Sequence, residues 1–423
     1  MTTNTFTHRH ACHALLAATL VLLASCGGGG SSGAASTRTP TKIGTSQQGG
    51  QVSYTGVQSA RAASVVATDA VAVALGGTTY APAGLTLQRS PAGSGNPVYD
   101  KVQGTLGHLL AVRRSSMNRA TTALGKTARS AAATMATGTV YCDASLTGYY
   151  DYSYSEGLTS IEVTETYHDC NFGTGEILNG TVYFSLRLAS LTSIGFVFRL
   201  GNGDGALEPT DFTVATYSGT TLLGTSTASL TYSVDLDMPS ATVTNYALQV
   251  NGAIENRFTP DSLNGADANK TYLAGFNHYA ADVSFDSAVS TWSQTTNGAL
   301  LLSKTDNGVS PATVESANIA YSKLQLGVQT NAGGNGVFTI TGTITSDFTP
   351  DACHEGMFTF ETVVPVEVSA STGQPLAGHL VINDQTHVIF NADGTVSVSL
   401  DGGATYATMT LAELENICSV AVL

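Results

Sequence analysis

The chain has 423 residues, of which only 11% are charged, and 45 of them are glycine. That length suffices for a large core or for two domains, and abundant Ser, Thr, Tyr and Val with little Lys is typical of an exported all-β protein. The net charge of −14 argues against a nucleic-acid partner, because an acidic body repels phosphate.

Residues 1–25 are predicted to be a lipoprotein signal peptide. A polar leader precedes the short apolar run Ala14–Leu23, which is well below the roughly 20 apolar residues that span a bilayer. The run closes on Leu23-Ala24-Ser25-Cys26, so we expect Cys26 to carry the lipid, including an N-acyl chain such as palmitate, that anchors the protein in the membrane. Gly27 rather than Asp follows the cysteine, which favours the outer membrane; the face of the membrane stays open.

Residues 26–52 are rich in Gly, Ser and Thr and are predicted to be a flexible tether. Residues 53–136 are predicted to be partly helical, and Asp100–Ala133 is the best helix candidate because an apolar stripe runs opposite a basic face. Such a helix either touches anionic lipid or packs on the acidic body. The charge supports this division. Before Thr137 the chain has 11 Lys and Arg residues and two acidic residues, and from Thr137 onward it has 6 Lys and Arg residues (17 − 11) and 29 acidic residues (31 − 2).

Residues 137–423 are predicted to form an antiparallel β body, as a sheet, sandwich or open barrel of repeated hairpins. Short β-prone runs such as Thr181–Leu188 and Ser193–Leu200 alternate with Asn-Gly and Asp-Gly dipeptides, which tolerate the positive φ of tight hairpin turns. Such dipeptides include those that begin at Asn179, Asn202, Asn251, Asn297, Asn307, Asn335 and Asp393.

An internal repeat relates residues 230–261 to residues 319–351. The sequence Phe-Thr-Pro-Asp occurs at Phe258–Asp261 and again 90 residues later at Phe348–Asp351, with Asn251-Gly252 and Thr341-Gly342 preceding it at the same offset. Repeats of this kind predict strands that extend one common sheet.

Four cysteines remain in the body, Cys142, Cys170, Cys353 and Cys418, after Cys12 is removed with the leader and Cys26 is acylated. An even number in an oxidising compartment predicts two disulfides. Pairing Cys142 with Cys170 and Cys353 with Cys418 is the local choice among three, and the sequence leaves it open.

Several stretches resemble uncharacterised proteobacterial outer-membrane lipoproteins built from repeated β-hairpin units. They are Tyr167-His168-Asp169-Cys170, Leu178–Val182, Pro375–Ile382, Phe390–Val396 and Met409–Leu414, together with the start Leu23–Gly30. The resemblance implies a cell-envelope location and a β-rich fold, and it carries no activity.

Metal sites have only weak candidates. Cys353-His354-Glu355 and His168-Asp169-Cys170 contain ligand residue types, but a strand places alternate residues on opposite faces, so neither closes a site alone. Asn202, Asp204 and Asp211 partly match a calcium loop, although the first position would be Leu200 and the last an Asp rather than Glu. A plain turn explains the same residues, so no metal and no cofactor is expected.

Binding candidates are the tyrosines of the Tyr149–Tyr154 stretch. Tyr150, Tyr152 and Tyr154 alternate and therefore share one face of a strand. They would either bind a glycan or a peptide, or form a cross-strand ladder that stabilises the sheet.

No catalytic signature is found in the β body: HExxH and a phosphate loop are missing from the sequence, and the match to G-x-S-x-G at Gly29–Gly33 belongs to the Gly/Ser-rich tether. We therefore expect a cell-envelope lipoprotein with a non-catalytic binding or structural role, held to the membrane by its lipid and partnered by an envelope protein or glycan. The alternatives are an envelope hydrolase with dispersed active-site residues and a surface adhesion or capture module. The oligomeric state stays open, since sheet edges can pair between chains.

Overall fold

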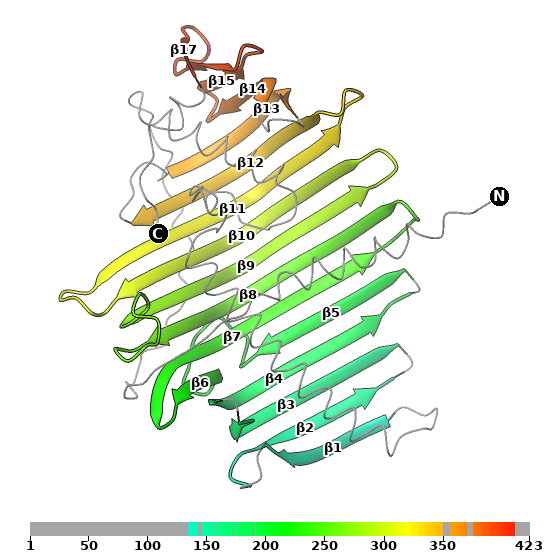
Figure 1. The fold of residues 1–423 in the computed structure, drawn as a ribbon. Helices are drawn as coiled ribbons and strands as arrows, with labels where there is room; N and C mark the ends of the chain where they lie inside the picture. The colour runs from blue at the N-terminus through cyan, green and yellow to red at the C-terminus, as the bar shows by residue number, and fades with distance from the viewer. Residues whose placement is uncertain are drawn as a thin grey trace.

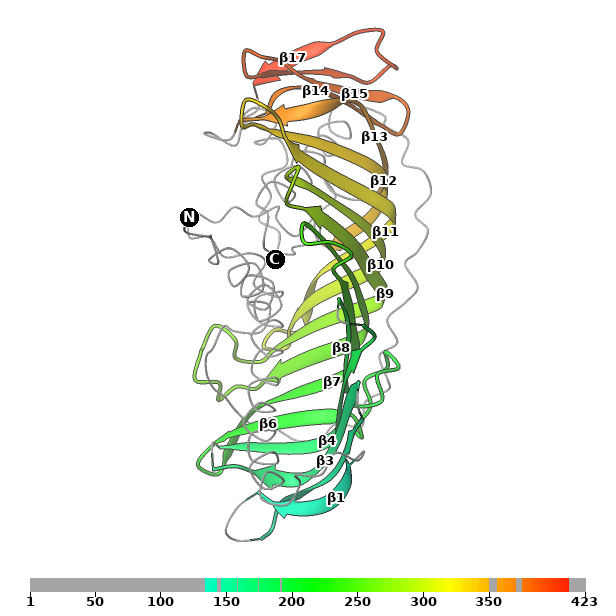
Figure 2. The same cartoon turned by 90° about the vertical axis from the view of Figure 1, so that its right-hand side faces the viewer.

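The protein forms one antiparallel sheet of 17 strands in the computed structural model, which describes residues 134–142, 146–157, 159–173, 175–190, 192–349, 356–369 and 375–410. Most strands pair with their neighbours in the sequence, so the chain runs up and down from β1 to β17, which lie at opposite ends of the sheet (Figure 1). The sheet curves along its length (Figure 2). This confirms the expected antiparallel β body, and the first strand starts at Thr134 rather than at Thr137.

The first nine strands are β1 (Thr134–Tyr141), β2 (Tyr149–Glu156), β3 (Ser160–Asn171), β4 (Glu176–Leu188), β5 (Ser193–Leu200), β6 (Phe212–Ser218), β7 (Thr221–Asp237), β8 (Val243–Phe258) and β9 (Lys270–Asp286). The other eight are β10 (Thr291–Asp306), β11 (Thr313–Thr330), β12 (Gly336–Thr349), β13 (Gly356–Val368), β14 (Pro375–Ile382), β15 (Thr386–Phe390), β16 (Thr395–Ser399) and β17 (Ala407–Thr410). The expected signal peptide, Cys26, the tether and the helical segment lie outside the described residues, apart from the last three residues of that segment.

The sheet has one apolar face and one polar face. Directly paired residues share a face, and Tyr321, Ile344 and Phe358, which pair across β11, β12 and β13, are all at most 5% exposed. On the opposite face, Thr343 pairs with Thr359, and their hydroxyls lie 3.2 Å apart. The alternation of apolar and polar residues along each strand therefore determines which side of the sheet is buried.

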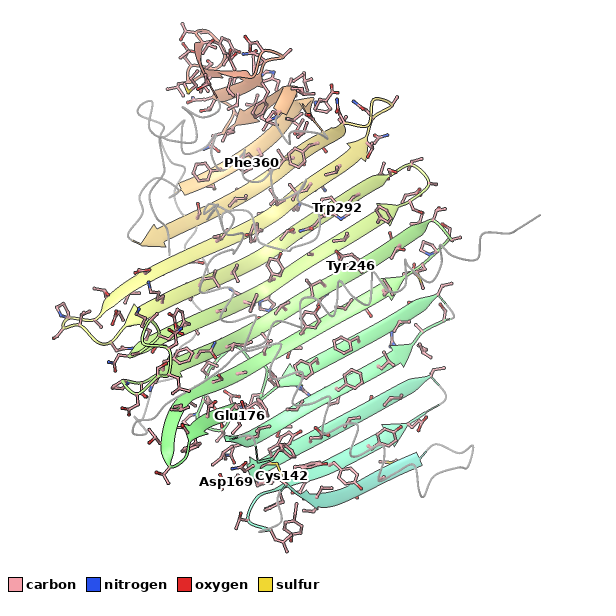
Figure 3. All side chains as sticks on the ribbon, viewed as in Figure 1. Cys142, Asp169, Glu176, Tyr246, Trp292 and Phe360 are labelled. Atoms are coloured by element: carbon pink, nitrogen blue, oxygen red, sulfur yellow. A yellow bond between two sulfur atoms is a disulfide. The ribbon has the colours of Figure 1, made fainter. Side chains whose placement is uncertain are left out.

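The apolar face forms one continuous cluster of buried side chains from β2 to β16. Its largest fully buried members include Tyr150, Phe198, Phe338, Phe358 and Phe360. Burying a side chain of this size contributes roughly 1.5–3 kcal/mol, so this face is the main source of stability. Phe360, Trp292 and Tyr246 show the face extending over three separate strands (Figure 3).

A row of bulges crosses the long central strands. At Gly252 of β8, Gly298 of β10 and Gly342 of β12 the pairing register shifts, and φ is +122°, +88° and +108°. A Cβ at any of the three would lie 2.1–2.2 Å from a carbonyl oxygen of the preceding strand, so the backbones approach closely where only glycine fits.

The bulges account for the internal repeat. Gly252 and Gly342 are 90 residues apart and hold the same position in β8 and β12, while Gly298 lies between them at spacings of 46 and 44 residues. The underlying unit is therefore a two-strand hairpin of about 45 residues. Asn251-Gly252 and Asn297-Gly298 were predicted as hairpin turns, but they lie within strands, as does Asn179-Gly180 in β4.

Between β4 and β7 one position of the sheet is shared by β5 and β6. Moving three residues along β4, from Val182 to Asn179, moves the partner by 13 residues, from Leu200 to Thr213, because the eleven residues 201–211 leave the ladder between β5 and β6. This excursion folds over the polar face, where Leu207 packs with Ala253 and Leu273. It contains the predicted calcium loop.

A disulfide joins Cys142, just after β1, to Cys170 in β3, with their Cα atoms 5.4 Å apart. It lies near Asp169, in the end of the sheet that β1, β2 and β3 form (Figure 3). The local pairing expected for these two cysteines is confirmed. Cys353 and Cys418 lie outside the described residues.

Candidate functional site

An aromatic surface lies on the polar face at one end of β1, β2 and β3. Tyr141 pairs with Tyr149, and Tyr149 pairs with His168, so the three rings form a row across the strands. The Tyr149 and His168 rings are stacked with centroids 4.5 Å apart, and Tyr141 meets Tyr149 edge-on at 6.3 Å. Tyr141 is 52% exposed, so the row is open to solvent.

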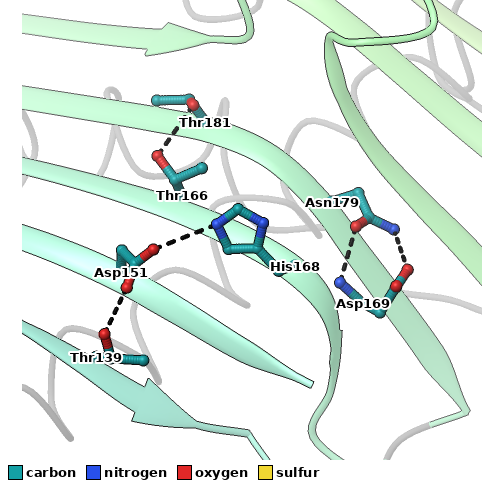
Figure 4. Close-up of polar contacts among 7 residues, drawn as sticks. All are labelled: Thr139, Asp151, Thr166, His168, Asp169, Asn179 and Thr181. Atoms are coloured by element: carbon teal, nitrogen blue, oxygen red, sulfur yellow. Dashed lines mark hydrogen bonds and ion pairs between the residues drawn. The ribbon is translucent and has the colours of Figure 1, made fainter. Parts of the chain in front are cut away.

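A row of polar side chains runs beside the rings. Thr139, Asp151, Thr166 and Thr181 pair in turn across β1 to β4. Thr139 donates a hydrogen bond of 2.5 Å to Asp151, and the Thr166 and Thr181 hydroxyls lie 3.1 Å apart. His168 reaches across to this row, with its Nε2 3.4 Å from Asp151 Oδ2 (Figure 4). These residues and the three rings together are called the Tyr149 patch below.

Two restraints hold the strand ends that carry the patch. The Cys142–Cys170 disulfide ties the end of β1 to β3, one residue beyond Tyr141 and two beyond His168. Next to it, Asp169 has a φ of +49°, and its N–H donates to Asn179 Oδ1 at 2.8 Å while Asn179 Nδ2 donates back to Asp169 Oδ1 at 3.0 Å (Figure 4). The rings are therefore displayed from a rigid part of the sheet.

The contacts within the patch suit binding better than catalysis. In a nucleophilic triad the hydroxyl contacts the histidine, and the carboxylate orients the histidine from the other side. Here the Thr139 hydroxyl donates to Asp151, and Asp151 lies between Thr139 and His168. The side chains of His168 and Asp151 are 42% and 52% exposed, so both are open to solvent.

The weak calcium-loop candidates Asn202, Asp204 and Asp211 lie in a segment that is closed by hydrogen bonds to its own backbone. Asp211, which is 1% exposed, accepts hydrogen bonds from the N–H groups of Asn202 at 2.9 Å and Glu208 at 2.7 Å. Asp204 accepts from the N–H of Ala206 at 3.0 Å. Both oxygens of Asp211 are thus used to fold the excursion.

The predicted tyrosine site lies on the other face of β2. Tyr150, Tyr152 and Tyr154 do share one side of the strand, and this is the apolar face, where Tyr150 is 1% exposed and its ring contacts that of Tyr167 at 5.4 Å. Tyr154 donates to Glu156, and burial followed by that hydrogen bond raises the pKa of Tyr154 to about 12. The contacts agree with a cross-strand ladder.

The Tyr149 patch combines residues that were not grouped by sequence reasoning. Tyr149 belongs to the dense tyrosine stretch, and His168 belongs to the cluster considered for metal. The possible Cys142–Cys170 disulfide is the sequence signal that could have grouped them, because such a bridge places the residues before Cys142 close to the residues before Cys170. Within the described ranges, no group of three or more His, Cys, Asp or Glu side chains is placed to hold a metal ion.

No protein-family model matches this chain, and no curated protein matches it. In the described part of the chain, no helix has the length and apolar character to cross a membrane.

Proposed function

We propose that this protein is a lipid-anchored binding protein of the cell envelope and that the Tyr149 patch binds glycans without cleaving them. The supporting observation is the stack of Tyr149 on His168 beside the Asp151 carboxylate. An aromatic ring offers an apolar platform for the C–H face of a sugar ring. The adjacent carboxylate and threonine hydroxyls supply acceptors and donors for the hydroxyls of the sugar.

The anchor is part of the proposal. Cys26 would hold the protein in the outer membrane, and residues 26–52 would give the sheet reach toward a glycan of the envelope or the cell surface. Replacing Cys26 with Ala should abolish the incorporation of labelled palmitate and release the protein from the membrane fraction.

Co-sedimentation with isolated peptidoglycan sacculi and with purified bacterial surface polysaccharides tests the binding. The full-length lipidated protein in detergent should sediment with at least one of these glycans. Tyr149→Ala should weaken that binding about tenfold or more, since truncating an aromatic anchor commonly costs about 1–4 kcal/mol. Tyr183→Ala is the matched control, because Tyr183 also lies on the polar face but is covered by Arg199, 4.9 Å from its ring centroid.

If Tyr149→Ala and Tyr183→Ala bind the glycan equally well, the Tyr149 patch is not the glycan-binding surface. The same samples distinguish glycan binding from the alternative function, glycan hydrolysis. Soluble sugar fragments that the wild-type protein releases, and that Asp151→Asn does not, would replace non-catalytic binding with hydrolysis.

A further inference from the structure

A second pair of polar-face side chains meets at the far end of the sheet. His379 of β14 pairs with Ile389 of β15, and His387 of β15 pairs with Val381 of β14, so the two histidines are diagonal neighbours on one face. Their rings are inclined by 35° with centroids 5.0 Å apart. His379 Nε2 lies 2.9 Å from His387 Nδ1.

The two facing nitrogens have the chemistry and the spacing of metal ligands. A neutral imidazole nitrogen is the commonest protein ligand for copper, nickel and zinc. Two nitrogens that bind one ion at roughly 2.0–2.1 Å with a right angle between them lie about 2.9 Å apart. A square-planar or tetragonal ion, as Cu²⁺ prefers, therefore fits the observed separation once it displaces the proton of the hydrogen bond between the two nitrogens.

The tight turn between the strands makes this arrangement rigid. Asn383 and Asp384 both adopt positive φ, at +52° and +58°, and Ile382 pairs with Thr386 directly across the turn. Gly403 lies beside His387: a Cβ at Gly403 would be 3.7 Å from His387 Nδ1 and 3.1 Å from the hydroxyl oxygen of Tyr406. Within the described residues no third His, Cys, Asp or Glu completes a ligand set.

We propose that His379 and His387 form a binding site for a divalent transition-metal ion of the Cu²⁺ class, with two imidazole ligands and water at the remaining positions. The nine strands from β5 to β13 separate the site from the Tyr149 patch in sheet order, since the site lies on β14 and β15 while the patch lies on β1 to β4. It does not depend on the proposed glycan binding.

Titration of the full-length exported protein with Cu²⁺ tests the site. Mass spectrometry first establishes that the leader, with His8, His10 and His13, has been removed. One Cu²⁺ should bind per chain at this site, with an electron paramagnetic resonance spectrum that shows coupling to two imidazole nitrogens. His379→Gln and His387→Gln should each weaken binding about 10- to 100-fold or more.

His278→Gln is the matched control, because His278 lies on β9, away from both proposed sites, and its replacement should leave the affinity for Cu²⁺ unchanged. Unchanged affinity in both His379→Gln and His387→Gln would overturn the proposal. A measurement on the wild-type protein guards against misfolded variants: substoichiometric Cu²⁺ should broaden the ring resonances of His379 and His387 first, and broadening of other histidines first would equally overturn it.

Discussion

Asn297 Oδ1 accepts a hydrogen bond of 2.8 Å from the backbone N–H of Lys323, a residue on the next strand whose φ is +48°. Asn251 holds the N–H of His278 in the same way at 3.1 Å, and His278 also has a φ of +48°. Each asparagine is followed by a bulge glycine. The asparagine side chain thus stabilises the positive-φ residue of a neighbouring strand. The glycine after it has no Cβ, so the backbone of the preceding strand can approach closely.

Gly298→Ala should lower the free energy of unfolding by about 2–5 kcal/mol. Alanine at a φ of +88° is strained by about 1–2 kcal/mol. Its Cβ would lie 2.2 Å from the carbonyl oxygen of His278, so the two strands must separate, at a further cost of about 1–3 kcal/mol. Urea unfolding monitored by circular dichroism measures the change.

Gly265→Ala serves as the control for that substitution. Gly265 lies between β8 and β9, no heavy atom approaches its missing Cβ within 4 Å, and the change should stay within about 0.5 kcal/mol. Similar losses in the two variants would mean that the close approach of β9 and β10 does not restrict residue 298.

The strands themselves were predictable because their side chains alternate. The predicted strand Thr181–Leu188 is part of β4, and the predicted strand Ser193–Leu200 is β5. Tyr150, Tyr152 and Tyr154 share one face of β2, as the two-residue period of a strand requires. The Asn-Gly dipeptides gave wrong turn predictions in mid-strand, because a residue with positive φ is needed in a bulge as well as in a turn. Asp393-Gly394 does lie in a hairpin turn, whereas Asn297-Gly298 lies in mid-strand.

The candidate sites depend on registers that the sequence does not reveal. Tyr149 meets His168 only because β2 and β3 pair in a register confined by the Cys142 bridge at the strand ends. His379 and His387 are eight residues apart, and no metal-ligand motif of the sequence joins them. Their contact follows from a tight turn at Asn383 and Asp384, which no Asn-Gly or Asp-Gly dipeptide marks.

Asp211→Asn should destabilise the protein by about 2–4 kcal/mol. The amide keeps the shape of the side chain, but it turns one acceptor into a donor that faces the N–H of Asn202 or Glu208. Asp204→Asn, on an exposed side chain, should cost about 1 kcal/mol or less. Thermal unfolding with and without a calcium chelator should give the same midpoint, and a midpoint that rises with added Ca²⁺ would show instead that the excursion holds an ion.

Removing the Cys142–Cys170 disulfide should lower the free energy of unfolding by about 3–4 kcal/mol. The bridge closes a loop with a sequence separation of 28 residues, and opening it gives conformational freedom back to the unfolded chain. The Cys142→Ser, Cys170→Ser double variant should unfold at a lower urea concentration than the wild-type protein when both are measured without reductant. A wild-type protein as stable in reductant as in its absence would contradict this estimate.

The turn between β16 and β17 should weaken in acid because of Asp401. Its carboxylate accepts hydrogen bonds from the hydroxyl and the N–H of Thr405 and from the hydroxyl of Ser399, and these contacts hold the pKa of Asp401 below its usual range. A lowered folded-state pKa means that this contribution is fully present above the unfolded value of about 3.9 and is lost as the pH falls through the folded pKa. The amide resonance of Thr405 in ¹⁵N-labelled protein should therefore stay constant from neutral pH to about pH 4 and shift only below it. In Asp401→Asn the same resonance should show no such step, and a wild-type transition at or above about pH 4 would refute the role of these three hydrogen bonds.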